Sequence, residues 1–370
     1  MGFSLKTSSP NDVTLRYVPY QKYRKNQANM KNDLQTRRNF LKIAGLASSA
    51  LPFSNSVFAS QFADAAKLDR MSPPNYAELR TYTGLLRLYD EFDLEPDKQA
   101  PKFQYEFSHP ELKRLRETYK LDQVAGAGDE FSKAMMIIKW MKEHIAYKPD
   151  ITSALPEVVK TLPMNAKGLI EYSFDKGQSA GINCYMHTIV LTEACLSVGL
   201  KCRTVSLNPL NPFDYDNHLV NVVWSTARSK WVMVDPSYNA YVSDEKGQVL
   251  DPWEIRDQLS RQCNVVCNDE LVFYGKKQDS QGYLRYLAKN LVYLHSPTFN
   301  SFDSTTTSKY PWLTLTPKHF DACKREAYHL KWLSQATKGN WDKDEFQKLM
   351  KDECYLVTTS SIASFFEPPH

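Results

Sequence analysis

Residues 184–198 restrict the possible folds of this chain more than any other segment. They predict a helix whose apolar side chains cover most of its circumference, with Glu193 as its only charged residue. A helix that is apolar on nearly all sides must be enclosed by other elements. Asn183 is a suitable N-cap and Gly199 a suitable stop signal. We therefore expect a mixed fold around a central helix that begins at Cys184.

Three segments after this helix have the composition of β-strands. They cover residues 201–207, 218–224 and 231–235, and the last two are rich in Val and Trp. The polar connection 225–230 is short enough for a hairpin. A turn centred between Thr226 and Ala227 would place His218 directly opposite Asp235. A register slip of one residue would send Asp235 to the other face of the sheet.

Cys184, His218 and Asp235 together have the residue types of a nucleophile, a base and an orienting carboxylate. A thiol attacks as thiolate, and a helix N-terminus beside an imidazole favours that form. Asp235 could accept a hydrogen bond from one ring nitrogen of His218 and leave the other nitrogen for Cys184. Two alternatives stay open. A single Cys on a buried helix is usually an inert small hydrophobe. His187, one turn after Cys184, is either a rival base or a polar group that lines the site.

At this point the chain resembles the transglutaminase-like superfamily, a branch of the papain-like cysteine enzymes, over residues 128 to 250. The matching pieces are the aromatic Tyr185 after the cysteine, the segment 197–203, the His218 strand and the strand from Trp231 to Asp235-Pro236. The resemblance implies an α+β fold with a central buried helix packed on an antiparallel sheet. It gives Cys184 the nucleophile position, His218 the base position and Asp235 the orienting position.

The same resemblance indicates how an oxyanion could be bound. In papain-like enzymes a Gln six residues before the cysteine donates a hydrogen bond to the oxyanion. Gln178 is therefore a candidate donor, together with the backbone N–H of Cys184. The alternative for Gln178 is a solvated loop residue. Two departures concern the groove: Gly181 stands one place further from the cysteine than the family glycine, and Leu219-Val220 follow His218 where Ala-Trp is common.

The function implied is that of a cysteine hydrolase or acyltransferase. It would act on peptide or carboxamide bonds through a thioester, with a peptide, a protein or a cell-wall peptide as substrate. Hydrolysis and amine transfer differ only in the last step, so residues do not separate them. The superfamily also contains members without catalysis, so a catalytically silent binding module is the alternative.

The N-terminal region has the features of an export signal. Residues 36–42 resemble a twin-arginine motif, residues 43–51 are modestly apolar, and residues 57–59 suit a signal peptidase. The apolar run is too short and too rich in Ser to span a bilayer. We expect residues 1–59 to be a cleaved signal, the twin-arginine machinery to be a partner, and the mature chain to be exported to the periplasm without a membrane span. Met30 is an alternative start.

Removal of residues 1–59 changes the net charge of the chain. The mature part keeps 37 Lys and Arg residues against 40 Asp and Glu residues, a net charge of −3 instead of +4. No basic stripe remains for a nucleic acid. The chain has no HExxH motif, no CxxC pair with zinc-finger spacing and no Gly-rich phosphate loop, so we expect no metal and no cofactor.

Six cysteines remain beside Cys184, an even number that permits disulfides in an exported protein. Pairing of near neighbours would join 195 to 202, 263 to 267 and 323 to 354. Burial as free thiols is an equal alternative. Cys263 and Cys267 lack a nearby His and make a poor zinc site.

We expect residues 128–250 to form the core and the segments before and after it to form two scaffold regions. Residues 60–127 form a helical N-terminal segment and residues 251–370 a mostly helical region packed on the core. Helices are expected at 68–89, 110–121, 129–147, 166–174, 252–259, 282–294, 320–336 and 342–350, a strand at 102–107 and a loop at 296–309. Many aromatic residues between 274 and 312 predict either core and lid packing or a groove for peptide or sugar.

Overall fold

The computed structural model describes residues 74–149, 151, 155–214, 216–273, 275–304, 310–336 and 356–369. The predicted signal at 1–59 and the predicted helix at 342–350 lie outside these ranges. The described chain mixes helices and strands and confirms the predicted α+β class. Within these ranges, no helix has both the length and the apolar character that a bilayer span requires.

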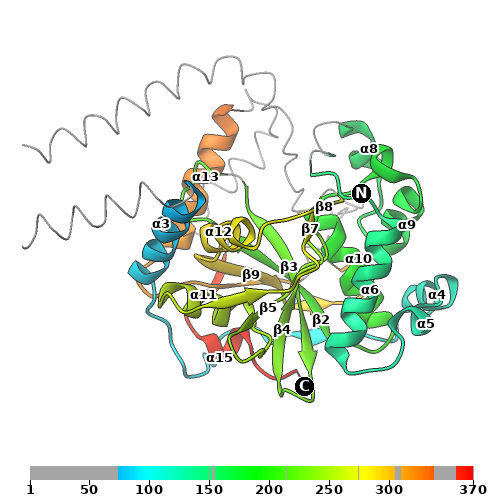
Figure 1. Cartoon of the computed structure of the whole chain (residues 1–370), viewed down its shortest axis with the longest axis horizontal. Coiled ribbons are helices and arrows are strands. Elements are labelled where there is room, and N and C mark those ends of the chain that lie inside the picture. The colour runs from blue at the N-terminus through cyan, green and yellow to red at the C-terminus, as the bar shows by residue number, and fades with distance from the viewer. Residues whose placement is uncertain are drawn as a thin grey trace, which may run out of the picture.

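A six-stranded sheet forms the centre of the described part of the chain (Figure 1). Its strand order is β12-β11-β9-β2-β3-β4. All neighbouring strands in it are antiparallel except β11 and β12, which are parallel. The strands are β2 (Cys202–Asn208), β3 (His218–Ser225), β4 (Lys230–Val234), β9 (Tyr293–Pro297), β11 (Trp312–Leu315) and β12 (Val357–Thr359).

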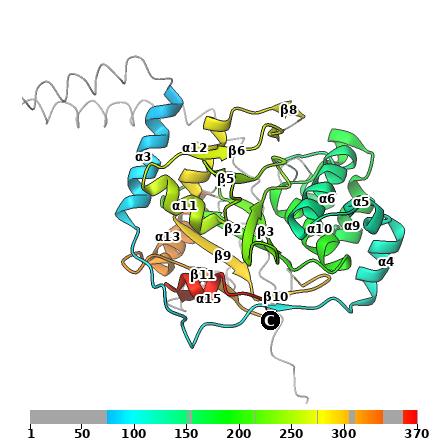
Figure 2. The same ribbon diagram turned by 60° about the horizontal axis from the view of Figure 1, so that its bottom comes forward.

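Helices cover both faces of this sheet, as the two views in Figures 1 and 2 show. One face carries α6 (Glu130–His144), α9 (Ala166–Ser173) and α10 (Cys184–Ser197), and the other carries α3 (Pro74–Leu88), α11 (Pro252–Ser260) and α12 (Ser280–Asn290). The remaining helices are α4 (Pro110–Thr118), α5 (Leu121–Ala125), α8 (Pro156–Thr161), the 3₁₀ turn η2 (Gly177–Ala180), α13 (Ala322–Ala336) and α15 (Ile362–Phe365). Small two-stranded sheets pair β1 (Gln104–Tyr105) with β10 (Phe299–Asn300), β5 (Val242–Asp244) with β6 (Val265–Cys267) and β7 (Val272–Phe273) with β8 (Lys276–Lys277).

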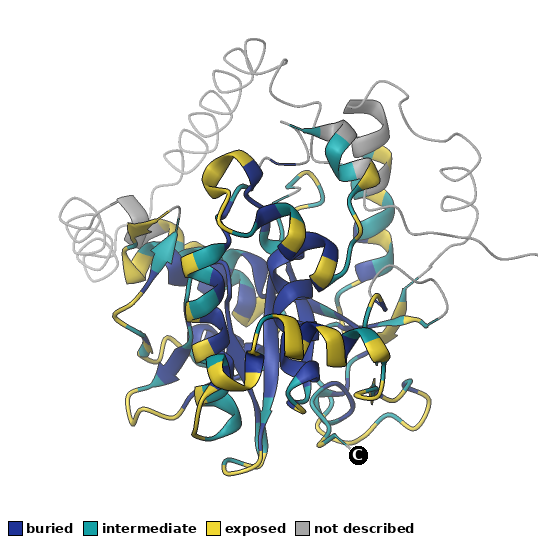
Figure 3. Cartoon of the chain, turned by 90° about the vertical axis from the view of Figure 1, so that its right-hand side faces the viewer, coloured by how far each residue is buried: buried dark blue, intermediate teal, exposed yellow. Residues whose placement is uncertain are grey.

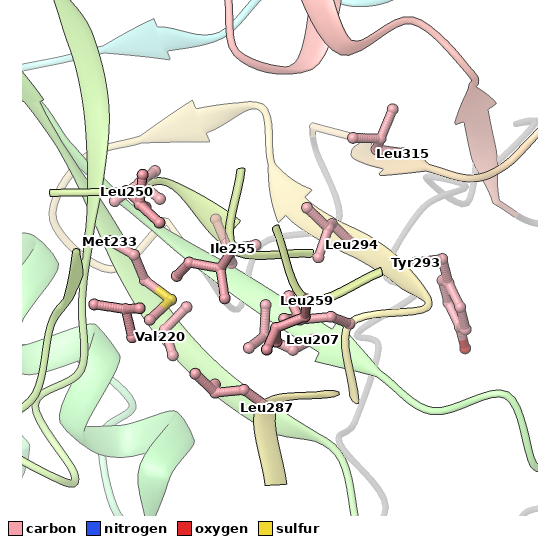
Figure 4. Close-up of a cluster of buried hydrophobic side chains, with 14 of the residues drawn as sticks. Leu207, Val220, Met233, Leu250, Ile255, Leu259, Leu287, Tyr293, Leu294 and Leu315 are labelled. Atoms are coloured by element: carbon pink, nitrogen blue, oxygen red, sulfur yellow. The ribbon is translucent and has the colours of Figure 1, made fainter. Parts of the chain in front are cut away.

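The alternation of side chains along the strands divides the interior into two cores. On β3, Leu219 and Val223 pack with α6, α9 and α10, whereas Val220 and Val222 pack with α11 and α12. Figure 4 shows the second core, in which Val220 and Met233 from the sheet lie near Leu287 from α12. His218 and Asp235 have the parity of this second core, which places their side chains on the α12 face.

The central helix is as buried as its sequence predicts. Every residue from Tyr185 to Ser197 is buried, and Figure 3 shows the buried residues gathered at the centre of the molecule. The Asn183 side chain accepts a hydrogen bond from the backbone N–H of Met186 at 3.1 Å, as an N-cap does. The helix ends at Ser197, two residues before Gly199, whose φ of +81° is a left-handed conformation that glycine adopts without strain.

The C-terminal region contributes more strand than the sequence analysis foresaw. It supplies β9, β11 and β12, half of the central sheet in the described ranges. The helix predicted at 282–294 ends at Asn290, and the loop predicted at 296–309 begins inside a strand. Only Leu291 and Val292 separate α12 from β9, so the apolar pattern continues from one element into the next without a turn signal.

Four of the six further cysteines are free thiols, which corrects two of the suggested disulfides. Cys195 and Cys202 are both buried, with their thiols in hydrogen-bond contact. Cys263 is exposed whereas Cys267 packs in the core, so the two side chains point to different environments. Cys323 is disulfide-bonded, and its suggested partner Cys354 lies outside the described residues.

Candidate active site

Cys184 is the first residue of α10 and is partly exposed, in contrast to the buried helix that follows it. The Asn183 side chain binds the backbone N–H of Met186 and so fixes the first turn of α10. The first N–H groups of a helix have no partner within the helix, and Cys184 lies at this end. A helix N-terminus carries partial positive charge, which favours a thiolate and a developing oxyanion at this position.

The chain just before Cys184 is held by a neighbouring segment. Ile182 donates its backbone N–H to the carbonyl of Ala146 at 2.9 Å and accepts from the N–H of Lys148 at 2.8 Å. At Gly181 the two segments approach so closely that a Cβ would lie 2.8 Å from the Cβ of Lys148 and 3.0 Å from the carbonyl oxygen of Ala146. Glycine is therefore required at position 181 by close approach of the backbone.

His218 and Asp235 meet although the predicted register is wrong by two residues. Trp224 pairs with Trp231 and Asn221 with Val234, because the turn, residues 226–229, is centred between Ala227 and Arg228, one residue later than predicted. In this register Asp235 follows the last residue of β4 and lies diagonally from His218. A shift of two residues keeps both side chains on one face. His218 Nε2 and Asp235 Oδ2 lie 2.6 Å apart, with both side chains almost wholly buried.

The Asp235 carboxylate accepts hydrogen bonds on both oxygens. Oδ1 accepts from the backbone N–H groups of Ser237 at 2.8 Å and Tyr238 at 3.2 Å, within the turn that ends β4. Oδ2 accepts from the Tyr283 hydroxyl at 2.9 Å in addition to His218. A buried carboxylate with four donors is held in one orientation, so the ring of His218 is fixed as well.

The surroundings of His218 stabilise its protonated form. Burial by itself would lower the pKa of His218, but the charge and hydrogen bond of Asp235, together with the Cys184 side chain, outweigh burial and raise this pKa to about 10. The Cys184 thiol is within side-chain hydrogen-bond reach of the His218 ring. Since Nε2 is bonded to Asp235, Nδ1 is the nitrogen left for Cys184. This arrangement can hold a thiolate beside an imidazolium.

His187 has a different environment from His218. Its side chain is wholly buried, and neither ring nitrogen has a hydrogen-bond partner among the described residues. Burial and the nearby Lys142 ammonium lower the pKa of His187 well below its usual value, so the ring is neutral. It packs on the ring of Tyr147, with 5.5 Å between ring centroids. His187 thus lacks the carboxylate partner that a working base of this type uses, and the geometry favours His218.

Gln178 lies on η2 and is exposed. It lines an open hollow of about 500 Å³ together with Phe273, Lys276 and Gln278 from the β7–β8 hairpin and its end. The hollow lies between the segment that leads to Cys184 and the hairpin that packs on Tyr238. Gln178 therefore borders a space that is open to a ligand. Its role in oxyanion binding stays a proposal.

Sequence reasoning missed Lys142 as a residue of the site. It belongs to α6, where the pattern indicates only an amphipathic helix, and its Nζ donates to the carbonyl of Ser237 at 2.9 Å. Burial lowers the pKa of Lys142 to about 8, although the Asp235 charge acts in the opposite direction. No local motif marks this lysine, because its neighbours come from a distant turn.

Of Tyr238, Phe273 and Tyr286, which lie at and behind the His218 ring, only Tyr286 belongs to the segment 274–312 that the sequence analysis assigned to packing or to a groove. Tyr238 stacks on Phe273 with ring centroids 4.3 Å apart and also meets the edge of His218. Tyr286 on α12 lies 5.1 Å from the His218 ring, and its hydroxyl donates to Asp216. The aromatic density of residues 274–312 was a signal for Tyr286, but the sequence analysis gave none for Tyr238 or Phe273.

Within the described ranges, no group of three or more His, Cys, Asp or Glu side chains is arranged to hold a metal ion. The expected absence of a metal or cofactor thus stays an expectation from the sequence. The chemistry available from the residues themselves is that of a thiol, an imidazole and a carboxylate in series.

The sequence model of the Transglutaminase-like superfamily matches residues 117–236, which include Cys184, His218 and Asp235. One similar solved structure is described as "a Putative Cysteine Protease from Cytophaga hutchinsonii". The two share 13% sequence identity over 52% of this chain and 64% of the other, with a TM-score of 0.23. The comparison with curated proteins finds no match. Residues 117–236 therefore form a domain of the transglutaminase-like superfamily.

Proposed function

We propose that the protein is a cysteine hydrolase or acyltransferase that cleaves peptide or carboxamide bonds through a covalent thioester. The observation that supports this most directly is the buried hydrogen bond of 2.6 Å between His218 and Asp235, with the partly exposed Cys184 thiol on the other side of the ring. Cys184 is the nucleophile, His218 the base and acid, and Asp235 the residue that orients His218.

The reaction follows from these positions in two halves. The Cys184 sulfur attacks the carbonyl carbon of the substrate, and its proton resides on His218 Nδ1. The tetrahedral intermediate carries its negative oxygen near the N-terminus of α10, where the Cys184 backbone N–H and the Gln178 amide are the proposed donors. His218 then gives the proton to the leaving amine or ammonia, and the C–N bond breaks to leave a thioester.

The second half consumes the thioester. A water molecule or an amine gives a proton to His218 as it attacks the thioester carbon, and the Cys184 sulfur leaves and recovers the proton from His218. Asp235 keeps its hydrogen bond to Nε2 throughout, so the ring does not rotate between its roles as base and acid. We favour hydrolysis of peptide or amide bonds, with a peptide, protein or cell-wall peptide as substrate.

A glutamine-bearing peptide offered with a labelled amine tests the reaction. Ammonia release without label is the expected result for a hydrolase, and label in the peptide would show amine transfer instead. Both should disappear in Cys184→Ala. Cys202→Ala is the matched control, because Cys202 is a buried free thiol of β2 that takes no part in the site.

A reactivity measurement separates an enzyme from a silent binding module. At about pH 6, iodoacetamide should modify Cys184 much faster than a cysteine in an unfolded peptide, and His218→Ala should remove the difference. Equal rates in the native protein and the peptide would contradict the proposed nucleophile and favour the binding module.

We also propose that residues 1–59 direct export through the twin-arginine route. The support is the motif at residues 36–42 and the apolar run that follows it. Replacement of Arg37 and Arg38 by Lys should retain the uncleaved precursor inside the cell. Processing and export that continue unchanged in this variant would contradict the proposal.

A further inference from the structure

The residues that complete the site include several from beyond the matched domain. The match ends at residue 236, but Tyr283 and Tyr286 of α12 and Phe273 of β7 all reach the environment of His218. Among them, Tyr283 makes direct contact with a member of the proposed triad. Its hydroxyl donates to Asp235 Oδ2, the same oxygen that binds His218.

The residues around Tyr283 hold its side chain in place. Tyr283 is only 2% exposed, and it packs in the core on the α12 side of the sheet. Its ring lies 4.8 Å from the ring of Tyr238, which itself meets the edge of His218. Burial and the charge of Asp235 raise the pKa of Tyr283 well above its usual value, so the hydroxyl keeps its proton and remains a donor.

We propose that Tyr283 is a positioning residue that fixes Asp235 Oδ2 and, through it, the ring of His218. Without the hydroxyl, Oδ2 would be held by His218 alone, while Oδ1 would still accept from Ser237 and Tyr238. The carboxylate would then be free to turn about its Oδ1 contacts. Tyr283 thus acts on the proposed reaction through Asp235. This inference rests on the function proposed above.

A purely structural role for Tyr283 is the competing explanation, because the ring fills space in the core. The two roles separate by atom: packing uses the ring, whereas positioning uses the hydroxyl. Tyr283→Phe keeps the ring and removes only the hydroxyl. Tyr293→Phe is a matched control, since Tyr293 is equally buried and donates its hydroxyl to another carboxylate, that of Glu326, away from the site.

The Tyr283 hydroxyl also affects the electrostatic interaction between Asp235 and His218. A donor on Oδ2 spreads the negative charge of Asp235, so its removal concentrates this charge on the His218 side. The titration midpoint of His218 should then move upward in Tyr283→Phe, by about half a pH unit for the loss of one ordinary hydrogen bond. A role in packing alone predicts no movement.

The test uses the full chain with ¹⁵N-labelled histidine and follows the ring nitrogens of His218 by NMR across the alkaline range. The His218→Ala spectrum assigns the signal. We expect the midpoint to rise in Tyr283→Phe and to stay unchanged in Tyr293→Phe. An unchanged midpoint in Tyr283→Phe would overturn the positioning role, whether or not the protein proves to be an enzyme.

The rate of Cys184 alkylation at pH 6 supplies a second measurement. At this pH His218 is protonated in both proteins, so the rate reports how well its ring is positioned beside the thiol. We expect Tyr283→Phe to lower the rate roughly three- to tenfold, the effect of one hydrogen bond, with normal near-ultraviolet circular dichroism. A slow rate in the wild type would count against the proposed function. A fast rate in the wild type and in Tyr283→Phe alike would count against the inference alone.

Discussion

At the scale of single residues, the site depends on how Asp235 is held. The backbone of its own turn binds one carboxylate oxygen, and side chains from β3 and α12 bind the other. This carboxylate keeps His218 protonated despite burial, which by itself would favour the neutral ring. The consequence is a histidine whose charge contributes to stability as well as to the proposed chemistry.

The pH dependence of stability should show this contribution. The pKa of His218 rises from its usual value of 6.5 to about 10 on folding, so its stabilisation is complete below pH 6.5 and is lost as the pH rises through 10. We expect the wild type to have a higher free energy of unfolding than Asp235→Asn, and this difference to be largest near pH 6. The difference should shrink by more than about 1 kcal/mol by pH 10.5 in urea titrations.

An exposed histidine pair provides the control. His144 and Asp175 lie 2.8 Å apart at the surface, and Asp175→Asn should change stability little at either pH because solvent screens the pair. A constant difference between wild type and Asp235→Asn across the pH range would show that His218 does not carry the charge.

At the scale of elements, the approach of residues 146–148 to the start of α10 sets the position of the nucleophile. Tyr147 and Ile182 form a parallel bridge, and Gly181 allows the contact because it has no Cβ. The family pattern places a glycine nearer the cysteine, and here the glycine stands where the two backbones come closest. The requirement is steric, since Gly181 has an ordinary negative φ of −67°.

Gly181→Ala should therefore push these segments apart. We expect a loss of about 1–3 kcal/mol in the free energy of unfolding, as for other overpacked sites, and a slower alkylation of Cys184. Gly84→Ala in α3 is the control, because no atom lies within 4 Å of its added Cβ. That variant should be neutral or stabilised by up to about 1 kcal/mol. Equal behaviour of the two variants would contradict the steric argument.

The hairpin shows at the same scale what a strand pattern can and cannot predict. The alternation along β3 and β4 predicted the correct faces for His218 and Asp235, because a side chain's face depends only on parity. The pairing itself was wrong by two residues, because the polar composition of residues 225–230 did not show that the turn is centred between Ala227 and Arg228. Diagonal neighbours across two strands are still close enough for a histidine to reach a carboxylate.

At the scale of the whole molecule, Arg203 joins three distant parts of the chain. It lies on β2, is wholly buried, and its guanidinium lies 3.7 Å from the ring centroid of Phe103 and 4.6 Å from that of Trp231. It also donates to the carbonyl of Phe365 in α15 at 2.6 Å. One side chain thus links the N-terminal region, the central sheet and the C-terminal end.

Arg203→Lys should show how far this contact stabilises the assembly. Lysine keeps the charge but loses the planar group that stacks on aromatic rings, so we expect a loss of roughly 2 kcal/mol in urea unfolding. The segment after residue 356 should also become more sensitive to limited proteolysis. Arg114→Lys, at an exposed arginine that pairs with Glu111, should change neither. Unchanged stability in Arg203→Lys would refute the proposed link.

The sequence by itself determined the buried helix, its cap, the strands β2, β3 and β4 and the candidates Cys184, His218 and Asp235, because these follow from local pattern and motif. Hydrophobic coverage of most of the helix circumference requires burial of residues 185–197, and alternation requires His218 and Asp235 to share a face. Only the tertiary structure decided the register, the strands β9, β11 and β12, the free thiols and the parts played by Tyr283 and Lys142. Each of these depends on segments far apart in the chain, whose contacts leave no mark in either segment alone.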